Sequence, residues 1–106
     1  MARAMQRELL PILHSMKFII EFGDKEKHRL EYNFNQLFGR LVIKVDERPV
    51  KTAYRLVNEP EIEVHVFRVG RFEQSLVRIE KQRKQLLGHR NRVFVNNRLV
   101  KVVENN

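Results

Sequence analysis

Hydrophobic and polar residues alternate along much of this chain, which is the period-two pattern of half-buried β-strands. In the clearest example, Leu30, Tyr32 and Phe34 alternate with charged or amide residues. Segments 23–25 and 46–48, which combine Gly or Asp with charged residues, have the composition of turns between such strands. The pattern predicts eight short strands, at about 18–22, 29–34, 41–45, 50–57, 62–69, 72–80, 91–95 and 98–103.

The second half of the chain repeats the first. With an offset of 47, residues 19–23 (IIEFG) align with 66–70 (VFRVG), and Glu26 aligns with Glu73. With an offset of 50, residues 45–51 align with 95–101. We therefore predict two four-strand meanders, which form an eight-stranded antiparallel β-sandwich. The predicted repeat units are 17–57 and 62–103, within one β domain at 17–106 that follows an N-terminal arm or short helix at 1–16.

One segment of the second unit also has a helical pattern. Residues 71–88 are rich in Lys, Arg, Gln and Glu, with leucines near helical spacing and Gly88 where a helix would end. If this segment and residues 24–39 were both helices, the fold would become an α+β ferredoxin-like duplication. The alternation at 29–34, which includes an aromatic pair, favours the all-β alternative.

The order of these strand and turn motifs resembles the Fas apoptosis inhibitory molecule family. The resemblance rests on residues 28–32 (HRLEY), Gly39 and residues 42–48 (VIKVDER), with a second occurrence at 76–79, Gly88 and 92–98. Glu47 stands where that family prefers Gly, and Ser75 stands where the first copy has His28. The resemblance implies a non-catalytic β-sandwich that acts through protein–protein contact, and it carries over no catalytic residue.

The composition is that of one folded domain. Hydrophobic residues are 42% and charged residues 32% of the 106, a balance that favours a globular chain over a disordered one. The absence of Cys excludes disulfides and thiolate metal sites, and it is compatible with the cytoplasmic location that we expect. No apolar run approaches the roughly 18 residues of a membrane span.

Positive charge is concentrated in one part of the sequence. The chain has 21 Lys and Arg against 13 Asp and Glu, a net charge of +8, and residues 78–92 alone carry +5. In a meander this run is a hairpin, and a basic hairpin can follow a phosphate backbone. A solvated loop, or pairing with acidic residues at 59–63, would explain the same charges. The candidate polyanion-binding residues are Arg78, Lys81, Arg83, Lys84, Arg90 and Arg92.

The corresponding loop of the first unit is apolar. Leu37 and Phe38 lie at its predicted tip, where exposed side chains would form a docking patch for a partner. Burial of the same residues against the N-terminal arm is the alternative.

The sequence shows no catalytic or metal-binding motif. The four histidines lack the close-spaced pair of a zinc site, and no phosphate-binding loop or nucleophile elbow is present. Glu61 and Glu63 share a face of a predicted strand, where a solvated polar face explains them better than acid–base chemistry. We therefore expect no enzyme activity, no metal and no cofactor. The predicted function is protein–protein interaction with an unidentified partner, and the alternative is binding of nucleic acid or another polyanion through hairpin 78–92.

Overall fold

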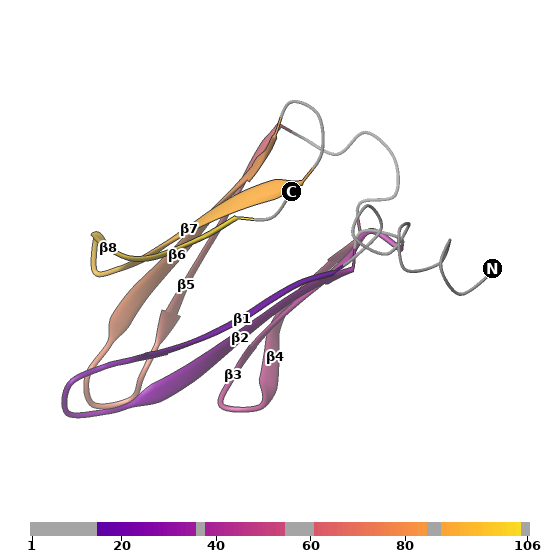
Figure 1. Ribbon diagram of the computed structural model, residues 1–106. Helices are drawn as coiled ribbons and strands as arrows, with labels where there is room; N and C mark the ends of the chain where they lie inside the picture. Colours follow the sequence, from indigo (N-terminus) through magenta and orange to yellow (C-terminus); the bar gives the residue numbers. More distant parts are fainter. Residues whose placement is uncertain (1–14, 36–37, 55–60, 85–87, 105–106) are drawn as a thin grey trace, which may run out of the picture.

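The computed structural model describes residues 15–35, 38–54, 61–84 and 88–104, and these form eight antiparallel strands in two four-stranded sheets (Figure 1). The predicted all-β fold is confirmed. The described residues contain no helix, so the ferredoxin-like alternative is not supported. The segment with helical propensity instead provides a strand at Ser75–Arg83.

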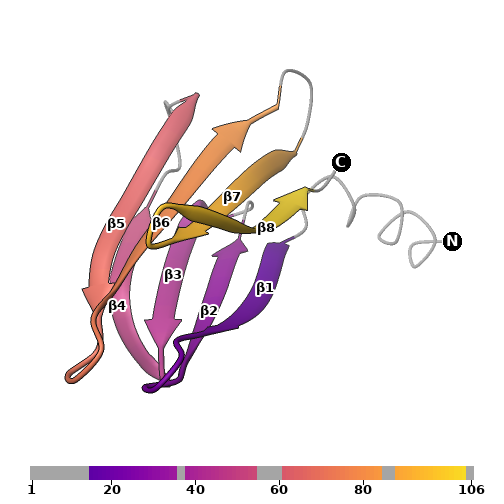
Figure 2. The ribbon, with the colours of Figure 1, turned by 90° about the vertical axis from the view of Figure 1, so that its left-hand side faces the viewer.

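Each sheet is a simple meander. Sheet A consists of β1 (Ser15–Phe22), β2 (His28–Asn35), β3 (Arg40–Val45) and β4 (Arg48–Tyr54), in that order. Sheet B consists of β5 (Ile62–Val69), β6 (Ser75–Arg83), β7 (His89–Val95) and β8 (Arg98–Glu104). Figure 1 shows the two sheets as separate layers, and in the turned view of Figure 2 one sheet overlies the other. Strand β1 begins two residues before the predicted start of the β domain, and residues 1–14 of the predicted arm lie outside the described residues.

The core lies between the inner faces of the two sheets, where the alternating residues of the sequence meet. Leu30, Tyr32 and Phe34 of β2 are all buried, and the Phe18 ring stacks on the Tyr32 ring with centroids 4.6 Å apart. Val77, Ile79 and Val93 of sheet B complete this core opposite them, as the apolar face of each sheet must be covered by the other.

The duplication extends to the irregular positions of the two sheets. Asp46 and Glu47 have positive φ angles in the β3–β4 turn, and Asn96 and Asn97 have positive φ angles in the β7–β8 turn. Two consecutive residues of this kind form the two-residue turn whose twist matches antiparallel strands. In the strand before each of these turns the pairing register shifts by one residue, between Ile43 and Lys44 in sheet A and between the equivalent Val93 and Phe94 in sheet B. Each β3–β4-type hairpin is therefore irregular at the same place.

The two sheets are joined at one end by a reciprocal exchange of hydrogen bonds. The Glu26 carboxylate accepts backbone N–H groups of Arg71, Phe72 and Glu73 at 2.6–3.3 Å. The equivalent Glu73 carboxylate accepts those of Asp24, Lys25 and Glu26 at 2.7–3.5 Å. We call this arrangement the glutamate clasp. Because the N–H groups favour a charged acceptor, they lower the pKa of Glu26 to about 2 and also lower that of Glu73.

Backbone conformation at the clasp requires glycine. Gly23 and Gly70, which open the two turns, have φ angles of +102° and +118°. A Cβ atom at either position would lie 2.0 Å from the carbonyl oxygen of the clasp glutamate in its own turn. The two aligned glycines of the sequence thus serve one purpose, to let each turn close tightly around its glutamate.

A histidine extends the clasp in the first unit only. His28 Nδ1 lies 2.6 Å from Asp46 Oδ2, and His28 Nε2 lies 2.8 Å from Glu26 Oε2. The hydrogen bond to Asp46 and then that to Glu26 raise the pKa of His28. The second unit has Ser75 and Asn96 at these positions, and the Asn96 side-chain oxygen accepts the N–H of Leu76.

This arrangement predicts a loss of stability on the alkaline side. A histidine with a raised folded pKa stabilises the fold fully below its unfolded value of 6.5, and that contribution is lost as the pH rises through the folded pKa. Above that pKa one ring nitrogen faces a carboxylate without a proton. We expect the melting temperature of the wild type to fall in this range and that of His28→Ser to stay flatter. An equal alkaline loss in the variant would contradict the role of His28.

No helix in the described part of the chain is long and apolar enough to cross a membrane.

Candidate functional site

The basic run at 78–92 does not form a free cationic surface. Arg78 donates to Glu80 and to the Asn97 side-chain oxygen, and its guanidinium lies 4.2 Å from the centroid of the Phe94 ring. Lys84 and Arg90 both pair with Glu104, at 2.8 and 3.2 Å. These two cations lower the pKa of Glu104 to about 2. Three of the predicted anion-binding side chains, Arg78, Lys84 and Arg90, therefore already have carboxylate partners within the protein, and they share two carboxylates.

Lys81 lies inside the protein. Its side chain belongs to the inner face of β6, the residue is only 3% exposed, and its ammonium nitrogen lies 3.4 Å from the centroid of the Phe34 ring. The alternation that buries Val77 and Ile79 also buries Lys81, which is the next residue on that face. The interpretation of Lys81 as a surface anion contact is thus corrected. Among the predicted residues Arg83 is exposed and Arg92 is half-buried.

Lys81 belongs to a buried polar cluster, formed with Glu63, His65, His89 and Asn91. These five residues lie on the inner faces of β5, β6 and β7, and Glu63, Lys81 and Asn91 follow one another across the sheet in register. His65 Nε2 lies 3.2 Å from Glu63 Oε1. His89 approaches the Phe34 ring edge-on at 5.0 Å, and the Asn91 amide donates to the Met16 sulfur. The described residues contain no group of side chains suited to hold a metal ion.

This buried polar cluster could have been detected in the sequence by comparing equivalent positions of the two repeat units. In the first unit, the positions equivalent to Glu63, Lys81 and Asn91 are Met16, Phe34 and Leu41, all buried and apolar. His65 likewise stands at the position of the buried Phe18, so a residue-by-residue comparison of the two units shows four polar substitutions on one face. The polar residues of sheet B pack on the apolar residues of sheet A. The inner faces of the two otherwise similar units therefore differ in polarity at this end of the core.

The predicted docking loop is described only in part. Leu37 lies outside the described residues. Phe38 is 61% exposed, and its backbone N–H donates to the Asn35 side-chain oxygen at 3.2 Å.

Strand β5 carries a row of exposed apolar residues. Ile62, Val64 and Val66 alternate on its outer face and are 60%, 49% and 56% exposed. Strand β5 is also the edge of sheet B, because it pairs only with β6. An edge strand presents a line of backbone groups that another strand can pair with.

The other three edge strands carry features that hinder such pairing. Strand β4 contains Pro49 and a register shift at Val50, and β8 contains Lys101 beside the equivalent shift at Val100. The outer face of β1 places charges at Lys17 and Glu21. Proline, bulges and charges are the usual protections of a sheet edge. Strand β5 has a continuous register with β6 and contains no proline or lysine. Its charges are Glu63 on the inner face and Arg68 near one end of the outer face, so the centre of its outer face is the least protected of the four edges.

No family model matches the chain, and neither the curated proteins nor the solved structures contain a significant match to it.

Proposed function

We propose that this protein is a non-catalytic interaction module whose binding surface is the β5 edge. The observation that carries the proposal is the row Ile62, Val64 and Val66 on the least protected edge strand. An added strand would satisfy the backbone groups of that edge and cover the apolar row, which is the physical basis of recognition by strand addition. The resemblance to a family that acts through protein–protein contact supports the same class of function.

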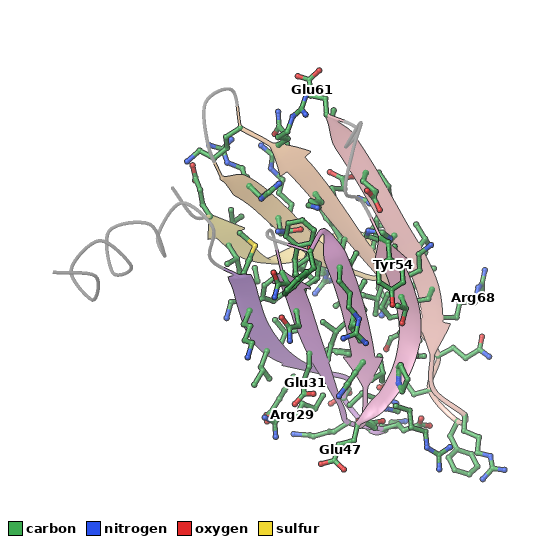
Figure 3. The ribbon with its side chains drawn as sticks, turned by 90° about the vertical axis from the view of Figure 1, so that its right-hand side faces the viewer. Arg29, Glu31, Glu47, Tyr54, Glu61 and Arg68 are labelled. Atoms are coloured by element: carbon green, nitrogen blue, oxygen red, sulfur yellow. The ribbon has the colours of Figure 1, made fainter. Side chains whose placement is uncertain are left out.

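The partner that fits this edge best is a second copy of the chain. In an antiparallel pair centred on Val64, Ile62 of each copy would face Val66 of the other, so the apolar row is self-complementary. Glu61 immediately precedes β5, and Arg68 lies near the other end of the strand (Figure 3). Antiparallel pairing therefore brings the acidic end of one strand to the basic end of the other. A two-fold dimer needs this kind of self-complementary surface.

The test is self-association of the purified protein, measured by sedimentation equilibrium over a range of concentrations. The surface is small, so we expect a reversible dimer with a dissociation constant on the order of micromolar. Val64→Lys should remove the dimer, because it places a charge at the centre of the pairing. Val50→Lys is the matched control, since Val50 is 46% exposed on the protected edge strand β4 and should leave the dimer unchanged.

Two outcomes would overturn the proposal. One is a wild-type protein that stays monomeric at every concentration. The other is a dimer that Val64→Lys does not weaken, which would place the interface elsewhere. Thermal melting of both variants shows whether the fold is preserved.

A further inference from the structure

The outer face of sheet A has a hollow lined by basic and polar residues, unlike the apolar row of β5. It has a volume of about 360 Å³ and lies over β1, β2 and β3. Its basic residues are Lys17, Arg40 and Lys44, and its floor includes Asn33. A second hollow of about 550 Å³ shares Lys17, Asn33, Arg40 and Val42 with the first, so the two are continuous.

The strand register explains why these side chains share one face. Lys17 pairs with Asn33, and Asn33 pairs with Val42, in one row across the sheet. In the next row Arg40 lies between Asn35 and Tyr54. Residues directly opposite each other in adjacent strands project to the same side. These two rows of side chains are therefore placed by the sheet itself and do not depend on a loop conformation.

The cations of this face differ from those of sheet B in their surroundings. Within the residues that the structure describes, the side chains of Lys17, Arg40 and Lys44 make no hydrogen bond or ion pair. Glu31, the one acidic residue of the hollow, is directly opposite Lys44 in the register, and its carboxylate lies 3.5 Å from Arg29. Figure 3 labels Arg29 and Glu31 at the lower end of this sheet. A face with three such cations favours an anionic ligand.

Two exposed aromatic rings border the same surface. Phe38 and Tyr54 line the second hollow, and each is 61% exposed. An acidic peptide would be attracted by the cations but has no need of ring faces. Nucleotide bases stack on such rings while their phosphates contact Lys and Arg, and amides such as Asn33 and Asn35 can bond base edges. The combination of rings, cations and amides on one open sheet favours single-stranded nucleic acid.

We propose that the outer face of sheet A binds single-stranded nucleic acid, with Lys17, Arg40 and Lys44 contacting phosphates and Tyr54 and Phe38 stacking on bases. This site is separate from the β5 edge and from the basic run at 78–92. It gives a role to the positive charge of sheet A, which the ion pairs within sheet B do not involve.

The test is fluorescence anisotropy of labelled oligothymidylate and oligouridylate over a salt series. The triple variant Lys17→Ser, Arg40→Ser, Lys44→Ser should weaken binding and reduce the log–log salt slope by about 2, because each phosphate that a cation no longer neutralises lowers the slope by roughly 0.7. The matched control is Arg83→Ser, Arg90→Ser, Arg92→Ser, which removes the same number of charges from the other sheet and should change binding little. Tyr54→Ser should weaken binding roughly tenfold, because the bases can no longer stack on its ring.

Three results would overturn the proposal. The first is no binding by the wild type near physiological salt. The second is an equal or larger loss of affinity in the control triple variant, which would assign binding to the basic run. The third is displacement of the oligonucleotide by polyglutamate of equal charge together with no effect of Tyr54→Ser, which would indicate a site that recognises charge alone. Circular dichroism of each variant confirms that the fold is retained.

Discussion

Lowering the pH from about 4.5 to about 2 should destabilise the protein, and the double variant Glu26→Gln, Glu73→Gln should remove much of that dependence. A glutamate whose pKa is lowered by folding stabilises the native state above its unfolded pKa. The contribution is lost as the pH falls through the folded pKa, which for Glu26 is about 2. Protonation or substitution replaces a charged acceptor by a neutral one, which the backbone N–H groups of the opposite turn bind more weakly.

The measurement is the melting temperature of the wild type and the variant across this pH range. At neutral pH the double variant should already melt at a lower temperature, because the two turns are no longer held by charge. As a control, Glu21→Gln with Glu47→Gln removes two exposed carboxylates that make no hydrogen bond or ion pair within the described residues. This control should keep the acid dependence of the wild type. Parallel pH profiles for the wild type and the clasp variant would show that the charged carboxylates of the glutamate clasp do not stabilise the fold.

Much of the fold can be predicted because its causes are local. The alternation of Leu30, Tyr32 and Phe34 with polar residues requires a strand with one buried face. The turn residues at 46–48 and their counterparts at 96–98 mark the ends of the hairpins, where the structure has paired positive φ angles. The helical propensity of residues 71–88 is overridden, because Val77 and Ile79 are needed to cover the apolar face of sheet A.

The surfaces are harder to predict because they depend on which face each residue occupies and on how the sheets meet. A sum of charge along the chain treats Lys81 as an exposed cation, because it ignores the alternation that buries this residue. The glutamate clasp joins residues 47 apart whose proximity follows only from the placement of one sheet against the other. The hollow of sheet A combines Lys17, Arg40 and Tyr54, which are distant in sequence and form no motif.

The substitution Phe34→Ala should be among the most destabilising in the protein. Phe34 is 2% exposed, and truncation of a buried phenylalanine typically costs about 3–5 kcal/mol of unfolding free energy. The cost here should lie at the upper end of that range. The same substitution removes the ring beneath the Lys81 ammonium, which is also the ring that packs at a steep angle against His89, and it leaves those polar groups beside a cavity.

Urea unfolding measures this cost, and a second phenylalanine provides the control. Phe38→Ala should change the unfolding free energy by less than about 0.5 kcal/mol, because Phe38 is largely exposed. Phe34→Leu keeps most of the apolar volume and isolates the contribution of the ring face. In a double-mutant cycle with Lys81→Met, it should couple to Lys81 by about 1–2 kcal/mol, the range expected for a desolvated cation–π contact. A coupling near zero would mean that the contact with the Phe34 ring does not stabilise the buried Lys81 ammonium, and that the other contacts of Lys81 do. The Phe and Lys that the two repeats have at this equivalent position would then pack together without any energetic effect of the charge.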